Sequence, residues 1–190
     1  DGDDRLPYIA SKAIEKATLH HKLHEAEFRP DTKSSFNKII GRSRPVKRMI
    51  DLARKVAVTD TTVLLLGETG TGKELLAEAI HNASRRRKGP FITINCAAIP
   101  KDLQESELFG HKKGSFTGAN SDKKGFFEVA DRGTIFLDEL GEMSAELQAK
   151  LLRAIENREF YRVGDTQPIP VDIRIISTTN RDMVDEDNSE

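Results

Sequence analysis

The sequence has little cysteine, no hydrophobic run long enough to cross a membrane and no recognisable secretion signal. Its single cysteine, Cys96, excludes a framework of disulfide bonds within the chain, which is in keeping with a reducing compartment. These absences lead us to expect a soluble, cytoplasmic protein without a membrane partner.

An excess of charge of one sign is also missing. The chain has 30 lysine and arginine residues against 31 aspartate and glutamate residues, so its net charge is -1. Proteins that hold nucleic acid through its phosphates usually carry a basic excess, and the overall charge therefore does not favour DNA as a direct partner. With 190 residues, 37% of them hydrophobic, the chain can form one domain around a hydrophobic core.

The clearest motif is the glycine-rich stretch 67–74, GETGTGKE, which lies between a hydrophobic run at 63–66 and a helical pattern at 75–80. A strand, a glycine-rich turn and a helix in this order are typical of a P-loop. Its backbone N–H groups would hold the α- and β-phosphates of ATP, and Lys73 would reach the β- and γ-phosphates. The candidate nucleotide ligands are Gly67, Glu68, Thr69, Gly70, Thr71, Gly72, Lys73 and Glu74.

A second group of polar residues follows the hydrophobic run 134–137. Glu74 stands where most P-loops have the Ser or Thr that binds Mg²⁺, so we expect Asp138 to hold the metal instead. Glu139 is then the candidate general base that accepts a proton from the attacking water. Asn180, after a further predicted strand, would sense the γ-phosphate or position water, although a simple capping role would also explain it.

The hydrophobic pattern predicts strands at 63–66, 91–95, 134–137 and 171–176. It predicts helices at 45–57, 75–80 and 103–109, and a further helix that Ser144 caps and that ends at Glu156. Strands that alternate with helices indicate an α/β fold with a parallel, doubly wound sheet flanked by helices.

The composition changes near residue 35. Residues 1–35 are polar with a weak hydrophobic stripe that predicts a helix at 8–28, so we interpret them as a helical linker ahead of a globular domain at 36–190. Three histidines of the linker are interpreted as part of a solvated helix face rather than as a metal site: His20, His21 and His24.

Two stretches inside the domain are predicted as loops. The basic stretch 84–88, SRRRK, is interpreted as a solvated loop rather than as a patch that binds phosphates. The glycine-rich stretch 112–124 is interpreted from its composition as a mobile surface loop.

Taken together, the motifs resemble the AAA+ domain of bacterial enhancer-binding proteins, the transcription activators of sigma-54 RNA polymerase. Besides the P-loop, they are found at 95–98, 107–111, 114–119, 133–139 and 178–182. The resemblance covers about residues 36–182. It implies a P-loop AAA+ core that binds and hydrolyses ATP with Mg²⁺ and works as a hexameric or heptameric ring.

The resemblance also implies roles for particular residues. Ile40 and Gly41 would line the adenine pocket, and Asn95 would hold Glu139 until the γ-phosphate is sensed. Glu128 and Arg162 match a pair thought to relay the nucleotide state. The loop that would contact sigma-54 consists of Gly114, Ser115, Phe116, Thr117, Gly118 and Ala119.

One residue of this loop and one residue just before it depart from the usual pattern of the family. Ser115 replaces an alanine, and Lys112 stands where an acidic residue is common.

The family's arginine fingers, helical lid and C-terminal domain for enhancer DNA do not occur in this sequence. We therefore expect a truncated domain whose linker leads from an upstream sensory domain. Two other functions stay open: a regulatory module that binds ATP without hydrolysis, and another AAA+ remodeller such as a protease-associated unfoldase. The loop 114–119 argues against the unfoldase.

Overall fold

The computed structural model describes residues 35–179. The helix predicted at 8–28, the three histidines beside it and Asn180 lie outside the described residues. Within the described part, no helix is both long enough and apolar enough to cross a membrane.

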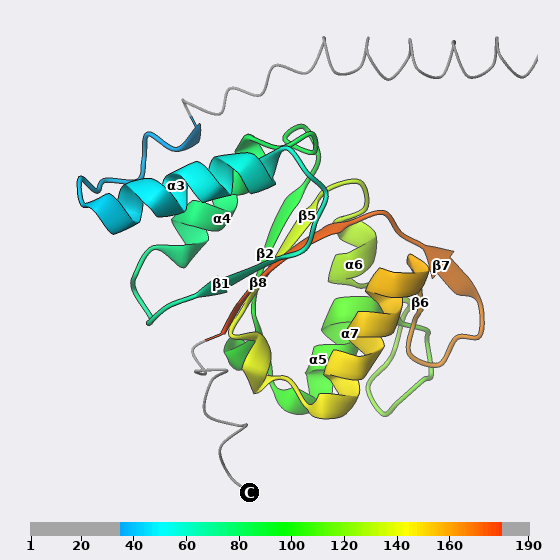
Figure 1. Cartoon of the computed structure of the whole chain (residues 1–190). Coiled ribbons are helices and arrows are strands. Elements are labelled where there is room, and N and C mark those ends of the chain that lie inside the picture. The colour runs from blue at the N-terminus through cyan, green and yellow to red at the C-terminus, as the bar shows by residue number, and fades with distance from the viewer. Residues whose placement is uncertain (1–34, 180–190) are drawn as a thin grey trace, which may run out of the picture. The chain divides into compact units, whose positions relative to one another are not determined.

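A parallel sheet of four strands forms the centre of the domain (Figure 1). In spatial order the strands are β1 (Val63–Leu66), β8 (Arg174–Thr179), β5 (Thr134–Asp138) and β2 (Phe91–Asn95). All neighbouring pairs run in the same direction. The predicted parallel α/β sheet is therefore confirmed.

Helices α3 (Arg44–Ala57) and α4 (Lys73–Asn82) cover one face of this sheet. Ser43 begins α3 by accepting a hydrogen bond from the backbone N–H of Val46, and Pro45 lies in the first turn. The buried core on this face comprises Phe36, Ala53, Ala57, Leu76, Ala77, Ala79, Ile80, Ala83, Phe136 and Ile176.

Helices α5 (Lys101–Phe109), α6 (Phe126–Val129) and α7 (Ala145–Asn157) cover the opposite face. As predicted, Ser144 caps α7. Along β5 the side chains alternate between the two cores: Phe136 joins the α3–α4 side, whereas Ile135 and Leu137 join the other. Because both faces are covered, nearly all of β5 is buried.

Two short antiparallel pairs and two 3-10 turns complete the described part. The pairs are β3 (Gly110–His111) with β4 (Lys123–Lys124), and β6 (Glu159–Tyr161) with β7 (Pro168–Pro170). The turns are η1 (Cys96–Ala98) after β2 and η2 (Leu140–Glu142) after β5. The glycine-rich stretch 112–122 thus joins two paired strands.

The last strand differs from its prediction, because it begins at Arg174 rather than at residue 171 and ends at Thr179. The residues before it are bonded elsewhere: the N–H of Val171 donates to Arg158, and the N–H of Asp172 donates to the carboxylate of Asp131. These backbone groups therefore do not join the sheet, although the hydrophobic pattern continues through them.

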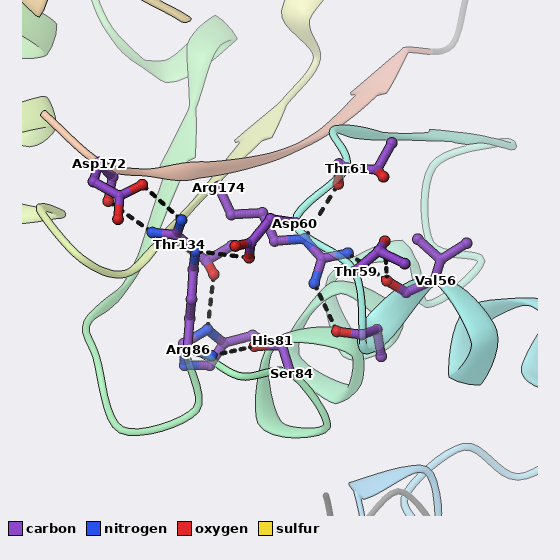
Figure 2. A network of polar contacts seen from close by, with 11 residues as sticks. Val56, Thr59, Asp60, Thr61, His81, Ser84, Arg86, Thr134, Asp172 and Arg174 are labelled. Carbon is purple, nitrogen blue, oxygen red and sulfur yellow. Dashed lines mark hydrogen bonds and ion pairs between the residues drawn. The ribbon is translucent and has the colours of Figure 1, made fainter. Parts of the chain in front are cut away.

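The basic stretch 84–88 is not simply a solvated loop, and that interpretation is wrong for Arg86. Its side chain, only 11% exposed, donates from Nε to Asp60 at 3.0 Å and from Nη2 to Asp172 at 2.7 Å (Figure 2). Burial alone would lower the pKa of Arg86, but the two carboxylates outweigh it and raise the pKa. Arg86 is therefore a structural cation.

Arg174 is a second structural cation of this network, and its exposure is 1%. Its guanidinium donates to the carbonyl oxygens of Val56 at 2.9 Å, Ala57 at 3.0 Å and Thr61 at 3.3 Å. Burial lowers the pKa of Arg174, and the nearby Asp60 opposes that effect. The start of β8 is thereby bonded to the end of α3 and to the segment that leads into β1.

His81, on α4, is buried beside the same network. Its Nδ1 lies 2.9 Å from the Thr134 hydroxyl, and its ring lies 5.1 Å from that of Phe91. Burial, followed by the charge of Arg174, lowers the pKa of His81 below its ordinary value of 6.5.

This shift predicts a loss of stability in mild acid. Below about pH 6.5 the unfolded chain binds a proton that the folded chain does not, so the free energy of unfolding should fall by up to about 1.4 kcal/mol per pH unit. Above that pH neither the folded nor the unfolded chain binds this proton, so His81 no longer lowers the free energy of unfolding. We expect His81→Gln to flatten this dependence between about pH 5 and 7, measured by urea unfolding. An equally steep dependence in the variant would show that another group is responsible.

Candidate functional site

The carboxyl ends of the four central strands meet at one edge of the sheet. The P-loop follows β1 there, Asp138 and Glu139 lie at the end of β5, and Asn95 ends β2 in register with Asp138. The last residues of β8 lie between β1 and β5, since Thr178 pairs with Leu65. Residues that are far apart in the sequence therefore share one site, which is where parallel sheets bind ligands.

The P-loop has the backbone that a phosphate site needs. Gly70 and Gly72 have φ angles of 82° and 87°, which side chains rarely allow, and a Cβ at either position would meet no other atom within 4 Å. Gly72 directly precedes the first residue of α4, so the N-terminus of a ten-residue helix faces this loop. The loop therefore fits a phosphate chain held by backbone N–H groups.

Lys73 is positioned within this loop. Its Nζ donates to the carbonyl oxygens of Gly67 at 2.7 Å and Glu68 at 2.8 Å, and Thr71 bonds the same Glu68 oxygen at 2.7 Å. These bonds hold the ammonium group where the loop closes on itself. A bound phosphate chain would compete with the two carbonyls for this cation.

Asp138 and Glu139 are both held by one hydroxyl that our sequence interpretation did not single out. Thr178 Oγ1 donates to Asp138 Oδ1 at 2.5 Å and accepts from the backbone N–H of Glu139 at 2.9 Å. Glu139 has a φ of 56°, so the chain turns sharply directly after β5. The sequence signals for Thr178 were its place in a run of hydroxyl residues at a strand end and in the motif at 178–182, neither of which indicated its contact with Asp138.

The donors also fit Mg²⁺ bound together with a nucleotide. No group of three or more His, Cys, Asp or Glu side chains that could hold a metal ion occurs among residues 35–179. Mg²⁺ usually binds to one or two carboxylates and to the phosphates of its nucleotide, so Asp138 alone can provide the protein ligand. Glu74 is exposed in the first turn of α4.

Asn95 has a structural role at this edge. Its Oδ1 accepts hydrogen bonds from the N–H groups of Ala97 at 3.0 Å and Ala98 at 3.2 Å, so it caps η1. The predicted contact between Asn95 and Glu139 stays a prediction. Cys96, the next residue, is fully buried, and burial followed by the charges of nearby Asp138 and Glu139 raises the pKa of its thiol to about 12. Its side chain belongs to the hydrophobic core on the α5–α7 side of the sheet.

The two residues expected at the adenine precede α3. Ile40 is 98% exposed, and a Cβ at Gly41 would lie 2.6 Å from Cγ1 of Val46. The lack of a side chain at Gly41 thus allows the chain to approach α3 closely. The neighbouring Ile40 side chain is exposed and therefore accessible to a ligand. Its contact with adenine stays a prediction.

The stretch 114–119 forms a closed turn between β3 and β4. The N–H of Gly114 donates to the carbonyl of Ala119 at 2.8 Å, and the N–H of Ala119 donates to Phe116 at 3.0 Å. Ala119 is buried, whereas Phe116 at the tip is 39% exposed. The tip therefore presents part of an aromatic ring on the surface.

Glu128 and Arg162 form the ion pair that the sequence suggested. Glu128 Oε2 accepts from Arg162 Nη2 at 2.6 Å and from Nε at 3.2 Å. Burial alone would raise the pKa of Glu128, but the bonds from Arg162 and Lys124 outweigh it and lower the pKa. The pair connects α6 with the segment after β6, where Val163 bonds the backbone of Gly110.

A glycine-rich loop ahead of a helix, with an Asp–Glu pair at the end of an inner strand of the same parallel sheet, defines the P-loop nucleoside triphosphatase fold. The model of the Sigma-54 interaction domain family matches residues 39–189. The chain therefore belongs to the sigma-54 interaction domain family.

Individual relatives agree with this assignment. The chain is 53% identical over 171 residues to the nitrogen fixation protein AnfA of Azotobacter vinelandii, with 90% of the chain and 31% of AnfA covered. It is 48% identical over 180 residues to the regulatory protein AtoC of Escherichia coli (strain K12), with 95% of the chain and 39% of AtoC covered. The chain thus spans between 31% and 39% of the length of these curated relatives.

A solved structure has the same fold. The crystal structure of NtrX from Brucella abortus in complex with ATP matches with a TM-score of 0.69 at 35% sequence identity, and the match covers 94% of this chain and 36% of NtrX.

The position of Thr178 predicts a specific effect on turnover. Thr178→Val keeps the shape of the side chain but removes both hydrogen bonds, so we expect turnover of a bound nucleoside triphosphate to fall by about tenfold or more while the affinity for the nucleotide changes little. Thr178→Ser is the matched control and should retain most of the activity. Phosphate release and calorimetry measure the two quantities. An unchanged rate in Thr178→Val would show that the hydroxyl does not orient the reacting groups.

Proposed function

We propose that this chain is the ATP-binding and ATP-hydrolysing AAA+ domain of a sigma-54-dependent transcription activator that remodels the closed complex of RNA polymerase. The single observation that carries the proposal is the meeting of the P-loop with Asp138 and Glu139 at one edge of the sheet, in a chain of the sigma-54 interaction domain family. NtrX, which is similar over 94% of this chain, was solved with ATP.

In this proposal the P-loop and Lys73 bind the phosphates of ATP. Ile40 and Gly41 contact the adenine, and Asp138 holds Mg²⁺, which neutralises charge on the phosphates. A phosphate oxygen would replace the carbonyls of Gly67 and Glu68 that now bond the Lys73 ammonium group.

Glu139 accepts the proton of the attacking water. The hydrogen bond from its backbone N–H to Thr178 fixes the position of the residue, at the sharp turn directly after β5. Asn95 and Asn180 help to position Glu139 and the water. Hydrolysis would therefore use residues from three neighbouring strands and the segment after the fourth.

The loop 114–119 transmits the result to sigma-54. Phe116 provides an exposed aromatic contact, and the Glu128–Arg162 pair connects the base of the loop to α6. The protein would work in the cytoplasm as a hexameric or heptameric ring. It would bind enhancer DNA through a separate C-terminal domain.

The first test of this function separates binding from chemistry. Glu139→Gln should bind ATP with near-normal affinity but lose hydrolysis by about a hundredfold or more, as expected when a general base is removed. Lys73→Ala provides the contrast, because it should lose ATP binding itself. Calorimetry and phosphate release, both on the ring-forming protein, measure these effects. Hydrolysis at the parental rate in Glu139→Gln would require a different base.

The second test separates hydrolysis from its use. Phe116→Ala should leave ATP binding and basal turnover within a few-fold of the parent, because the tip belongs to neither the P-loop nor the Asp138–Glu139 pair. Retention of sigma-54 with a transition-state phosphate analogue should fail, together with open-complex formation, since an aromatic anchor can contribute about 2 kcal/mol or more to an interface. Normal retention and normal open-complex formation would overturn the activator assignment.

A further inference from the structure

The aromatic tip of the loop 114–119 already has a contact inside the protein. The ring of Phe116 meets the ring of His111 edge-on, with the centroids 5.0 Å apart and the planes at 68°. His111 is buried, and its Nδ1 lies 2.7 Å from the hydroxyl of Ser106 on α5. The imidazole is thus fixed from one side and supports Phe116 on the other.

The residue next to the tip makes a second contact. This residue is Ser115, and it contacts Gly164, which has a φ of 76°. A Cβ at Gly164 would lie only 2.5 Å from Cβ of Ser115. The loop therefore packs directly against the backbone of the segment between β6 and β7. In this position the Ser115 hydroxyl is buried, and it has no hydrogen-bond partner among the described residues.

The base of the loop is held more firmly than its tip. The N–H of Lys112 donates to the carbonyl of Val163 at 3.0 Å, and the ammonium of Lys112 lies 3.1 Å from Asp122 and 3.8 Å from Asp165. Asp122 also accepts the N–H of Lys113 at 2.8 Å. The contacts at Phe116 and Ser115 can therefore be released while the base keeps its bonds.

We propose that His111 is a positioning residue that holds Phe116 in a retracted position, and that Ser115 weakens this position. The ring surface of Phe116 that rests on His111 cannot contact a partner at the same time, so a partner binds the raised tip and shifts the equilibrium toward it. The Ser115 hydroxyl lacks a partner when the tip is retracted and is hydrated when the tip is raised, which favours the raised state. The part of this inference that concerns the partner rests on the proposed function.

A tryptophan in place of Phe116 gives a direct test, because the 190-residue chain contains no other tryptophan. With Phe116→Trp in the whole chain, His111→Asn should raise the acrylamide quenching constant of the indole by about two- to threefold, since an edge contact shifts a two-state equilibrium by about that much or more. Ser115→Ala should lower it. Unfolding midpoints are followed in parallel.

Two control variants separate the aromatic contact from general packing. His111→Phe keeps an aromatic ring but loses the bond to Ser106, so it should keep the tip retracted better than His111→Asn does. Ser106→Ala keeps the imidazole of His111 but removes its hydrogen bond to Ser106. It should give a quenching constant between those of the parent and His111→Asn. Equal quenching in the parent and His111→Asn, or equal changes in His111→Asn and His111→Phe, would overturn the role of His111.

Hydrogen exchange checks the result with the native Phe116 in place. The N–H of Ala119 bonds the carbonyl of Phe116 within the closed turn, so its exchange reports whether the tip opens. Exchange in the stretch 112–122 should be faster in His111→Asn and slower in Ser115→Ala than in the parent. Identical exchange in all three proteins would contradict the proposal.

Binding to purified sigma-54 tests the consequence for a partner. His111→Asn should bind about threefold more tightly than the parent, and Ser115→Ala more weakly, because each shifts the fraction of raised tips. If the parent does not bind sigma-54, the proposed function fails, while quenching and exchange still decide the role of His111. If the parent binds and His111→Asn raises the tip without a change in affinity, the partner does not select the raised state.

Discussion

The arrangement of the sheet depends on how the positive charge of the buried Arg174 side chain is compensated. Carbonyl oxygens of Val56, Ala57 and Thr61 accept from its guanidinium, and the negative end of the α3 dipole adds to the compensation. These bonds fix the start of β8 between β1 and β5. Thr178 follows in the same strand, ~13 Å further on, so the anchor at one end of β8 positions the Thr178 hydroxyl at the other.

A continuous series of contacts leads from this edge of the sheet to the loop 114–119. Asn95 caps η1, and Gln104 of α5 donates to two backbone carbonyls of the η1 segment at 2.9 Å and 3.2 Å. On the same helix Ser106 holds His111, which supports Phe116. Helix α5 therefore contacts both the η1 segment, through Gln104, and the His111 ring under Phe116, through Ser106. A shift of this helix would reach Phe116 without any change in the central strands.

The predictions that succeeded rest on short stretches of sequence. Residues 67–74 carry a P-loop because the glycines, the lysine and the following helix are adjacent. Asp138 is the last residue of β5, and Glu139 directly follows it. The prediction for residues 84–88 was wrong for Arg86, because a basic stretch looks the same whether its partners are water or distant carboxylates. The last strand was predicted too early, because hydrophobic residues before Arg174 follow the strand pattern while their backbone groups bond elsewhere.

The sequence by itself determined the order of the four central strands and of α3, α4, α5 and α7, together with the P-loop and the acidic pair, because backbone periodicity and the chemistry of neighbouring residues need no partner from elsewhere in the chain. Only the tertiary structure decided that Thr178 holds Asp138, that Arg86 pairs with Asp172, and that Phe116 rests on His111. The first two contacts join residues that are 40 and 86 positions apart. The third depends on how a turn closes. Such contacts follow from strand order, register and the path of each loop, which no local pattern records.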